Sequence, residues 1–213
     1  MLKVKLIVGS TRVGRNADKV LEWLVPQIRA QAGIDLEVLD LREWPLPFFQ
    51  ETLATIGNIQ SPTYSDPLVT RWNQTIAEAD AFVLLTPEYN HSFSAVLKNA
   101  IDSVFFSYGF RHKPVGFVGY SSGVAAGVRA VEQLNQVMLE AEAVPLRTQV
   151  LLPFIAAAFD ATGKPTNPAF AVGLQVMLED LIWLGNVLAK ARAAGAPPPA
   201  TLRIRAALTA PRG

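Results

Sequence analysis

The sequence predicts an α/β domain in which a parallel five-stranded sheet is covered by helices on both faces. Five short runs of β-branched and other apolar residues alternate along the chain with segments of helical periodicity. This alternation is typical of successive βαβ units. The runs cover residues 4–8, 34–39, 81–86, 115–120 and 144–152.

The polarity of the runs predicts their order in the sheet. The second run contains Asp35 and Glu37 and the fifth contains Arg147 and Gln149, whereas the other three are almost entirely apolar. Interior strands of a parallel sheet are covered on both faces, so the second and fifth runs are expected at the edges. Right-handed crossovers then give the doubly wound order 2-1-3-4-5, which reverses between the first and third strands. A ligand crevice is expected there, between the loops that follow these two strands.

Helical periodicity predicts five helices around the sheet. The first carries Ala17, Val20, Leu24 and Ile28 on one stripe and is expected to kink or end near Pro26. The others are expected at residues 68–79, 94–104, 124–141 and 168–194.

Two segments lie outside this alternation. Residues 42–67 form a long loop that carries several aromatic side chains, and contact with a partner is the favoured explanation. Residues 195–213 contain consecutive prolines and are expected to be a mobile tail. Residues 1–194 are therefore expected to form the single domain.

Composition argues against several classes of function. Nineteen Lys and Arg nearly balance eighteen Asp and Glu, for a formal charge of +1, so no nucleic-acid partner is expected. The chain has no cysteine and two histidines without metal-ligand spacing, so no metal site is expected. Redox chemistry would therefore need an organic cofactor.

Apolar patterning bears on location and assembly. The first apolar run is too short for a signal peptide, and the longest apolar stretch, residues 151–159, is about half the length that spans a bilayer. A soluble cytoplasmic protein without membrane association is therefore expected. Because 50% of the residues are apolar, a homodimer or dimer of dimers is expected. The helices after the third and fourth strands are expected to form its contact, through Phe105, Phe106, Val131 and Leu134.

The loop after the first strand suits a phosphate group. It reads Gly9-Ser10-Thr11-Arg12-Val13-Gly14-Arg15-Asn16 and leads into a helix. Helix-start amides, two hydroxyls and two guanidinium groups could meet the charge and acceptor oxygens of a phosphate. The alternative is a turn capped by Asn16, with solvated arginines. The loop lacks a complete Walker A or Gly-x-Gly-x-x-Gly motif, which favours a monophosphate over ATP or a pyrophosphate.

The loop after the third strand is rich in polar groups. It reads Thr86-Pro87-Glu88-Tyr89-Asn90-His91-Ser92. Its amides could bond a flat heterocycle, with Tyr89 or His91 near the ring. The alternative is a tight turn shaped by Pro87 and Asn90, with His91 on the surface.

The loop after the fourth strand, Gly119-Tyr120-Ser121-Ser122-Gly123, matches the Gly-x-Ser-x-Gly pattern of a hydrolase nucleophile elbow. Both histidines precede Ser121, whereas in α/β-hydrolases the histidine follows the serine, so the hydrolase interpretation is rejected. The favoured interpretation is that the small residues of this loop let a ring approach the backbone. The alternative is a purely structural turn.

With these loops in place, the chain resembles the NAD(P)H-dependent FMN reductase family, whose quinone, azo-dye and chromate reductases share a flavodoxin-like fold. The resemblance spans about residues 1–192. It is carried by Gly9-Ser10-Thr11-Arg12, Pro87-Glu88-Tyr89-Asn90, Leu97-Lys98-Asn99-Ala100-Ile101-Asp102, and Ser121-Ser122-Gly123 followed by Gly127 and Arg129. The chain departs from the family by having Arg15-Asn16-Ala17 where many members have Ser-x-Asn, and Ala126-Gly127 where a glycine pair is usual.

The resemblance implies a cofactor site. The first loop would hold the FMN phosphate, the third-strand loop would line the isoalloxazine, and the fourth-strand loop would close over it. The expected cofactor-binding residues are Ser10, Thr11, Arg12, Arg15, Asn16, Pro87, Glu88, Tyr89, Asn90, His91, Ser121, Ser122 and Gly123.

By this resemblance, the expected function is to pass electrons from NAD(P)H, through non-covalently bound FMN, to a small acceptor such as a quinone, free flavin, azo compound or metal oxyanion. No dedicated catalytic side chain is expected, because FMN carries the chemistry. The alternatives are a flavodoxin-like electron carrier or FMN-binding regulatory module, and a flavin-free structural protein. Flavodoxins tend to be strongly acidic, so the near-neutral charge favours the enzyme.

Overall fold

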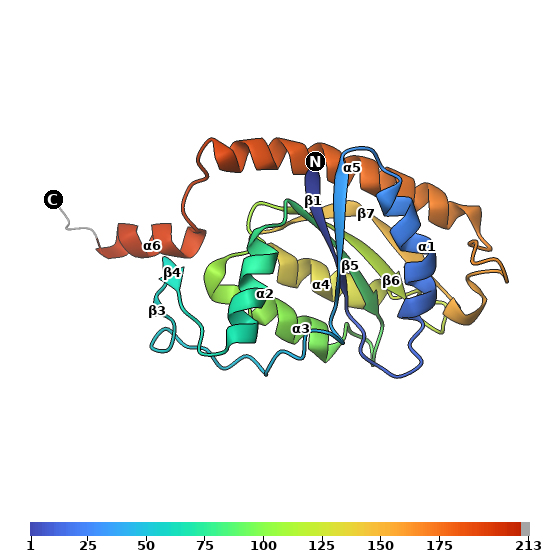
Figure 1. Cartoon of the computed structure of the whole chain (residues 1–213), viewed down its shortest axis with the longest axis horizontal. Helices are drawn as coiled ribbons and strands as arrows, with labels where there is room; N and C mark the ends of the chain where they lie inside the picture. Colours follow the sequence, from blue (N-terminus) through green and yellow to red (C-terminus); the bar gives the residue numbers. More distant parts are fainter. Residues whose placement is uncertain (210–213) are drawn as a thin grey trace.

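The central sheet is parallel and has the strand order β2-β1-β5-β6-β7. The computed structural model describes residues 1–209. This order confirms the predicted 2-1-3-4-5 arrangement, with the two polar runs at the edges (Figure 1). The strands are β1 (Leu2–Val8), β2 (Ile34–Asp40), β5 (Ala81–Pro87), β6 (Pro114–Tyr120) and β7 (Val144–Leu152).

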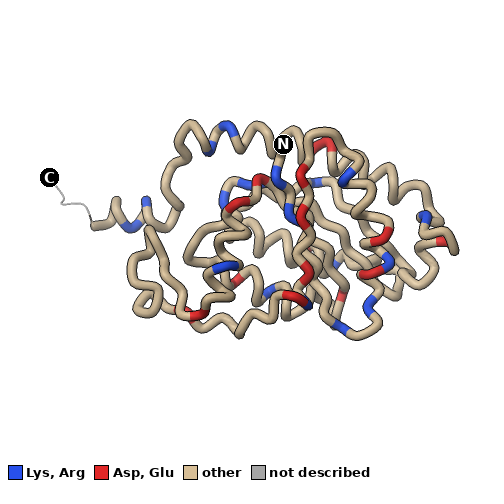
Figure 2. Tube along the Cα trace, viewed as in Figure 1, with Lys and Arg blue, Asp and Glu red and all other residues tan. Residues whose placement is uncertain are grey.

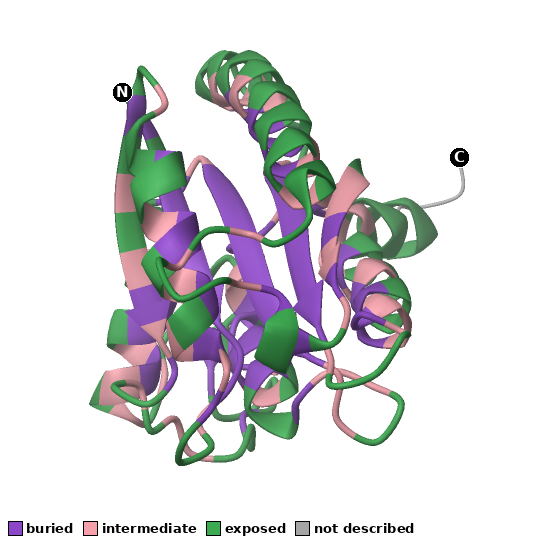
Figure 3. Ribbon diagram, turned by 90° about the vertical axis from the view of Figure 1, so that its right-hand side faces the viewer, coloured by how far each residue is buried: buried purple, intermediate pink, exposed green. Residues whose placement is uncertain are grey.

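Helices cover both faces of the sheet and enclose two separate cores (Figure 1). The helices are α1 (Ala17–Arg29), α2 (Pro67–Ala77), α3 (Ala95–Asp102), α4 (Val128–Glu140), α5 (Pro168–Ala193) and α6 (Ala200–Thr209). Side chains of α1 and α5 pack against one face, and those of α2, α3 and α4 pack against the other. Every residue of β5 and β6 is buried, as the purple central strands in Figure 3 show. The switch point between β1 and β5 is therefore held by rigid strands.

Two helix boundaries differ from the sequence prediction. The first helix continues through Pro26 to Arg29, because Pro26 and Glu22 lie on the exposed face, where water can bond the carbonyl that the proline leaves unpaired. The fourth helix begins at Val128 rather than 124, because Ala126 and Gly127 adopt left-handed backbone angles.

The loop over residues 42–67 packs largely on its own subunit. Trp44 packs edge-on against Trp72, with ring centroids 5.0 Å apart. The Asn99 side chain donates to the Pro47 carbonyl at 2.9 Å and accepts from the Phe49 amide at 2.8 Å. Within the loop lies a short hairpin of β3 (Gly57–Asn58) and β4 (Ser61–Pro62).

Part of the tail is helical over the residues that the structure describes, whereas the sequence predicted no regular structure there. Residues 200–209 form α6, whose first amide, that of Ala200, donates to the Glu142 side chain at 2.7 Å. Arg111 pairs with the other oxygen of Glu142 at 2.6 Å and also bonds the Pro197 carbonyl. The last four residues of the expected tail lie outside the described residues.

The expected dimer contact on α3 and α4 is largely wrong in its residues. Val131 and Leu134 are fully buried in the core of the subunit, and Phe106 is 9% exposed. These side chains already pack against the sheet, so a second subunit could not reach them without unfolding this layer. Phe105 is the exposed member of the set.

Candidate functional site

The loops after β1 and β5 face each other across the switch point and are bonded together. The Ser10 hydroxyl lies 2.6 Å from the Tyr89 hydroxyl, and the Ser94 hydroxyl donates to the Gly9 carbonyl. A side chain at Gly9 would place its Cβ 2.9 Å from the Leu85 carbonyl oxygen, so the glycine permits this close approach. The crevice expected between these loops is therefore present.

A cavity of about 200 Å³ lies at this crevice. Pockets that enclose a ligand usually measure roughly 300 to 1,000 Å³, so a flavin-sized ligand would remain partly exposed here. The residues that line it come from the carboxyl ends of four strands and the loops beyond: Arg12, Gly14, Arg15, Asn16, Pro87, Glu88, Tyr89, Tyr120, Ser121, Ser122 and Ile155.

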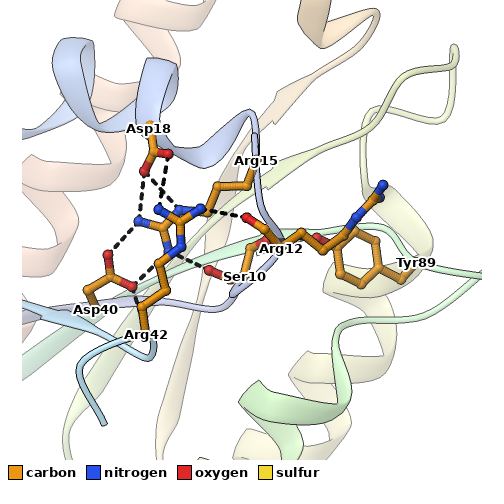
Figure 4. A network of polar contacts seen from close by, with 7 residues as sticks. All are labelled: Ser10, Arg12, Arg15, Asp18, Asp40, Arg42 and Tyr89. Carbon is orange, nitrogen blue, oxygen red and sulfur yellow. Dashed lines mark hydrogen bonds and ion pairs between the residues drawn. The ribbon is translucent and has the colours of Figure 1, made fainter. Parts of the chain in front are cut away.

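Arg15 lies beneath the first loop in a network of ion pairs (Figure 4). Its guanidinium donates to Asp40 at 2.7 Å and to Asp18 at 2.8 Å, and it also bonds the Ser10 carbonyl. Burial alone would raise the pKa of Asp40, but hydrogen bonds from Arg15 and from the Arg42 amide outweigh it and hold the pKa below its usual value. The charge of Arg15 is thus already compensated, and the residue fixes the loop.

Arg12 has a different environment from Arg15. Its side chain is exposed, and its guanidinium lies over the Tyr89 ring, 5.4 Å from the centroid (Figure 4). It forms none of the ion pairs found among residues 1–209. A cation held over an aromatic face and lacking a carboxylate partner is suited to bind an anion.

The start of α1 is open toward the same cavity. Asn16 occupies the cap position, but its side chain makes no capping hydrogen bond. The first amides of a helix have no partner within the helix and favour negative charge. The capped-turn alternative for this loop therefore lacks its defining hydrogen bond.

The loop after β5 contains a tight turn. Tyr89 and Ser92 exchange two backbone hydrogen bonds of 2.8 and 3.1 Å, and the residues between them, Asn90 and His91, both have positive φ. This arrangement holds Tyr89 toward the cavity, while Asn90 and His91 are exposed and do not line it. The carbonyl of His91 accepts a hydrogen bond from Gln133 at 2.8 Å.

Two buried polar atoms of the cavity residues have no hydrogen-bond partner. Glu88 pairs with Arg129 through Oε1 at 2.6 Å, and its Oε2 has no partner. The Tyr120 hydroxyl also lacks one. Among residues 1–209 these are the only buried side-chain oxygen or nitrogen atoms in this state. Such groups are costly when unpaired, and both belong to residues that line the cavity, so a small shift of these side chains would let a ligand supply the missing bonds.

The loop after β6 is shaped by its own backbone contacts. The Ser121 hydroxyl donates to the Gly123 carbonyl at 3.0 Å, and the Ile155 amide donates to the Ser121 carbonyl at 3.0 Å. A Cβ at Gly127 would lie 2.5 Å from the Tyr120 amide nitrogen, and the φ of Gly127 is +87°. A glycine is therefore required where α4 begins.

The structure gathers most, but not all, of the predicted site residues around one cavity. Eight of them line it, namely Arg12, Arg15, Asn16, Pro87, Glu88, Tyr89, Ser121 and Ser122. Ser10 is buried behind the cavity, and Thr11 faces a neighbouring hollow. Gly123, like Asn90 and His91, does not line the cavity.

Three lining residues were missed by the sequence prediction. Gly14 and Tyr120 stood within the quoted loops but were not selected. Ile155 follows the edge strand β7, whose carboxyl end reaches the same crevice. The parallel direction of all five strands was the available signal for it.

Comparison with known proteins identifies the family. The model of the NADPH-dependent FMN reductase family matches residues 2–157. The chain belongs to this family. An NAD(P)H-dependent FMN reductase of Pseudomonas aeruginosa is 30% identical over 187 residues, covering 86% of this chain and 95% of the relative. One from Schizosaccharomyces pombe is 31% identical over 153 residues, covering 71% and 74%.

A solved structure supports the fold. The flavoenzyme NAD(P)H:(acceptor) oxidoreductase FerB from Paracoccus denitrificans matches with a TM-score of 0.67 and 24% identity, covering 89% of this chain and 98% of that one. The flavodoxin-like fold is confirmed. Family membership also confirms the expected function, that of an FMN-dependent NAD(P)H oxidoreductase with FMN and NAD(P)H as its cofactors.

Proposed function

We propose that this FMN reductase binds FMN in the cavity between the loops after β1, β5 and β6. The observation that carries the assignment is the combination, in one cavity, of Arg12 without an ion pair and two buried polar atoms without partners. When bound, FMN supplies a ring that accepts a hydride from NAD(P)H and gives electrons to an acceptor. The residues of the chain bind and orient it.

The phosphate end lies at the first loop in this proposal. Arg12 supplies a positive charge, and the uncapped start of α1 supplies amide donors. Ser10 and Arg15 support the loop from below, through the bonds to Tyr89 and Asp40. Arg15 therefore contributes by holding the loop in place more than by contacting the phosphate.

The ring end lies toward β6. The free Oε2 of Glu88 can accept an N–H, and the Tyr120 hydroxyl can donate a hydrogen bond. Burial raises the pKa of Tyr120 to about 12, so the hydroxyl keeps its proton at neutral pH. Pro87, Tyr89, Ser121 and Ser122 give the walls.

The shallow cavity also bears on the acceptor. Nicotinamide and acceptor would have to use the same exposed ring face in turn. Double-reciprocal plots of the initial rate, at several fixed concentrations of the acceptor, should therefore give parallel lines, as in a ping-pong mechanism. Intersecting lines would contradict a shared face. Quinones, azo compounds, free flavin and metal oxyanions are the proposed acceptors, and a cytoplasmic homodimer is the proposed working form.

Flavin titration tests the assignment. Arg12→Ala should weaken FMN by about tenfold to a hundredfold, because a charge-assisted hydrogen bond is worth roughly 1.5 to 3 kcal/mol. Riboflavin, which has no phosphate, should bind weakly and be indifferent to the change. Arg147→Ala removes an exposed arginine that does not line the cavity and is the matched control. Equal losses for FMN and riboflavin would place Arg12 away from the phosphate.

A further inference from the structure

A second hollow lies at the amino ends of the strands, opposite the cofactor cavity. Its volume is about 580 Å³, and pockets that hold small molecules usually measure roughly 300 to 1,000 Å³. Lys113, directly before β6, and Ala77, at the end of α2, both line it. We call it the amino-end hollow. It shares no lining residue with the cofactor cavity.

Much of the wall of the amino-end hollow is apolar and comes from segments outside the sheet. Figure 1 shows two of these segments, α6 and the β3–β4 hairpin, at the same end of the molecule. The tail is held here by Arg111, which bonds the Pro197 carbonyl. The apolar lining residues are Ile59, Pro62, Phe106, Pro198, Pro199 and Leu202. They offer the body of a ligand a surface that excludes water.

Three cationic side chains line the same hollow, namely Arg111, Lys113 and Arg192. Arg111 pairs with Glu142 at 2.6 Å, and Arg192 pairs with Asp80 at 2.8 Å. Lys113 forms no ion pair with any of residues 1–209. The hollow therefore has one cation more than it has carboxylates.

The contacts of Lys113 leave part of its ammonium group unused. Its Nζ donates to the carbonyls of Ile76 and Ala77 at 3.0 and 2.8 Å, at the end of α2, although the residue is only 5% exposed. An ammonium group has three donors. Capping the helix explains two of them, and the third has no acceptor among the described residues.

The local potential at this corner is positive. Burial lowers the pKa of Lys113 to about 7, and Arg192 lowers it further. The pKa of His112 is also lowered, first by burial and then by the neighbouring charge of Arg111. After Asp180 the sequence contains Lys and Arg but no Asp or Glu, and the coloured segments of α6 in Figure 2 are blue. An anion in the hollow would be attracted by this potential.

Backbone strain also distinguishes this corner. Among residues 1–209 the non-glycine residues with positive φ fall into two groups. One group lies in the loops around the cofactor cavity and consists of Asn90, His91, Ala126 and Phe154. The other lies beside the amino-end hollow and consists of Tyr108, which lines it, with His112 and Glu142. Such conformations cluster where a protein holds a ligand.

We propose that the amino-end hollow binds a small organic carboxylate with an apolar body. The carboxylate accepts from the third N–H of Lys113 and from the guanidinium groups of Arg111 and Arg192, each of which uses two of its five donors within the described chain. The body lies against the prolines and Leu202.

The charge balance of the hollow selects a single negative charge. One cation in excess is neutralised by a monoanion, whereas a phosphate dianion would bring one charge too many beside Asp80 and Glu142. The site is thus distinct in chemistry from the cofactor cavity and does not depend on the FMN assignment.

Calorimetric titration of the FMN-saturated protein with 2-naphthoate is the first test. We expect one site per chain, and 2-naphthalenemethanol, which has the same rings without the charge, should bind at least about tenfold more weakly. Leu202→Glu places a like charge in the wall of the hollow and should weaken 2-naphthoate by at least about tenfold. Leu208→Glu makes the same change on α6 at a residue that is 81% exposed and should leave the affinity unchanged.

Three results would overturn the proposal. They are an absence of binding to the wild type, equal affinity for the acid and the alcohol, and equal affinities in the folded Leu202→Glu and Leu208→Glu variants. Circular dichroism establishes that both variants are folded. If Leu202→Glu does not fold, Lys113→Met takes its place and should also weaken 2-naphthoate by at least about tenfold.

Proton uptake tests the position of the carboxylate. The charged groups that act on the Lys113 amine are Arg192, Asp80 and Lys5. A bound anion raises the pKa of this amine, so affinity should fall as the pH rises from 7 to 9, and binding at pH 8 should take up a proton. Titrations in buffers with different heats of ionisation measure this uptake, which Lys113→Met should abolish. Affinity that is independent of pH would overturn the assignment of the carboxylate to Lys113.

Discussion

Arg15 donates to both carboxylate oxygens of Asp40, across the base of the loop after β1. The pair joins the first loop of the site to the end of the edge strand β2. Of the two arginines in that loop, Arg15 is therefore bound within the protein, and Arg12 carries the charge that is available to a ligand.

Arg15→Ala should reduce stability more than it reduces FMN affinity. It leaves Asp40 and Asp18 close together without their shared cation, at a cost of about 2 kcal/mol after allowance for the partial exposure of both carboxylates. For a chain of this size that corresponds to a melting temperature lower by roughly 4 to 8 °C. Differential scanning calorimetry beside an FMN titration measures both effects. A stable variant that loses FMN a hundredfold would show that Arg15 contacts the phosphate directly.

The same pair predicts a dependence of stability on pH. The pKa of Asp40 is lower in the folded protein than in the unfolded chain, so its contribution is present above the unfolded value of about 3.9 and is lost as pH falls through the folded value. Denaturant unfolding below pH 4 should therefore show wild type and Arg15→Ala converging in stability. A constant difference down to pH 2 would contradict this origin.

Tyr120→Phe should separate stability from flavin binding. Among residues 1–209 the hydroxyl has no partner with hydrogen-bond geometry, and Ser10 is near enough only to lower its pKa, so its removal should leave the free energy of unfolding unchanged or slightly increased. FMN affinity should fall about fivefold if the hydroxyl bonds the ligand. Urea unfolding of the flavin-free protein and flavin titration give the two values. Unchanged FMN binding would remove Tyr120 from the site.

Arg129→Ala should weaken FMN although Arg129 does not line the cavity. It leaves Glu88 buried without its ion pair, so the loop after β5 is free to shift and the carboxylate loses its orientation. We expect about a tenfold loss of FMN affinity, with partial recovery in Arg129→Lys. An unchanged dissociation constant for Arg129→Ala would show that Glu88 is held in place by other contacts.

Gly127→Ala should be more costly than Gly163→Ala. Both positions have positive φ, +87° and +78°, so both substitutions carry the same kind of backbone penalty, about 1 kcal/mol. Only at Gly127 would the new Cβ clash with backbone, 2.5 Å from the Tyr120 amide nitrogen. Gly127→Ala should therefore lose further stability and also flavin affinity, because the loop after β6 must move. Equal melting temperatures for the two variants would contradict this.

The strand order could be predicted from sequence because burial leaves a direct mark on composition. Charged residues such as Glu37 occur on edge strands, where one side meets solvent, and a buried strand such as β5 excludes them. The loops at the switch point could then be located from this strand order, because the crevice of a doubly wound sheet lies where the order reverses.

Partners of individual side chains in the site were harder to predict. Arg12 and Arg15 have the same chemistry, and only the fold brings Asp40 within reach of one of them. Likewise the Tyr120 hydroxyl, on the last residue of the fully buried strand β6, lacks a partner among the described residues only because of the packing around it. Helix α6 was not predicted, because the prolines that precede it suggested disorder. In the structure the Glu142 side chain accepts a hydrogen bond from the Ala200 amide and holds the first turn of the helix.

The hydrogen bond between Ser10 and Tyr89 has a consequence for the thermodynamics of binding. It ties together two loops that are far apart in sequence and leaves little loop entropy to be lost when a ligand arrives. Association should then be limited by diffusion and desolvation instead of by loop closure, and its heat-capacity change should reflect only the surface that the ligand covers. Without this bond the two loops would be joined through Ser94 and Gly9 alone, and binding would carry an added entropic cost for ordering Tyr89.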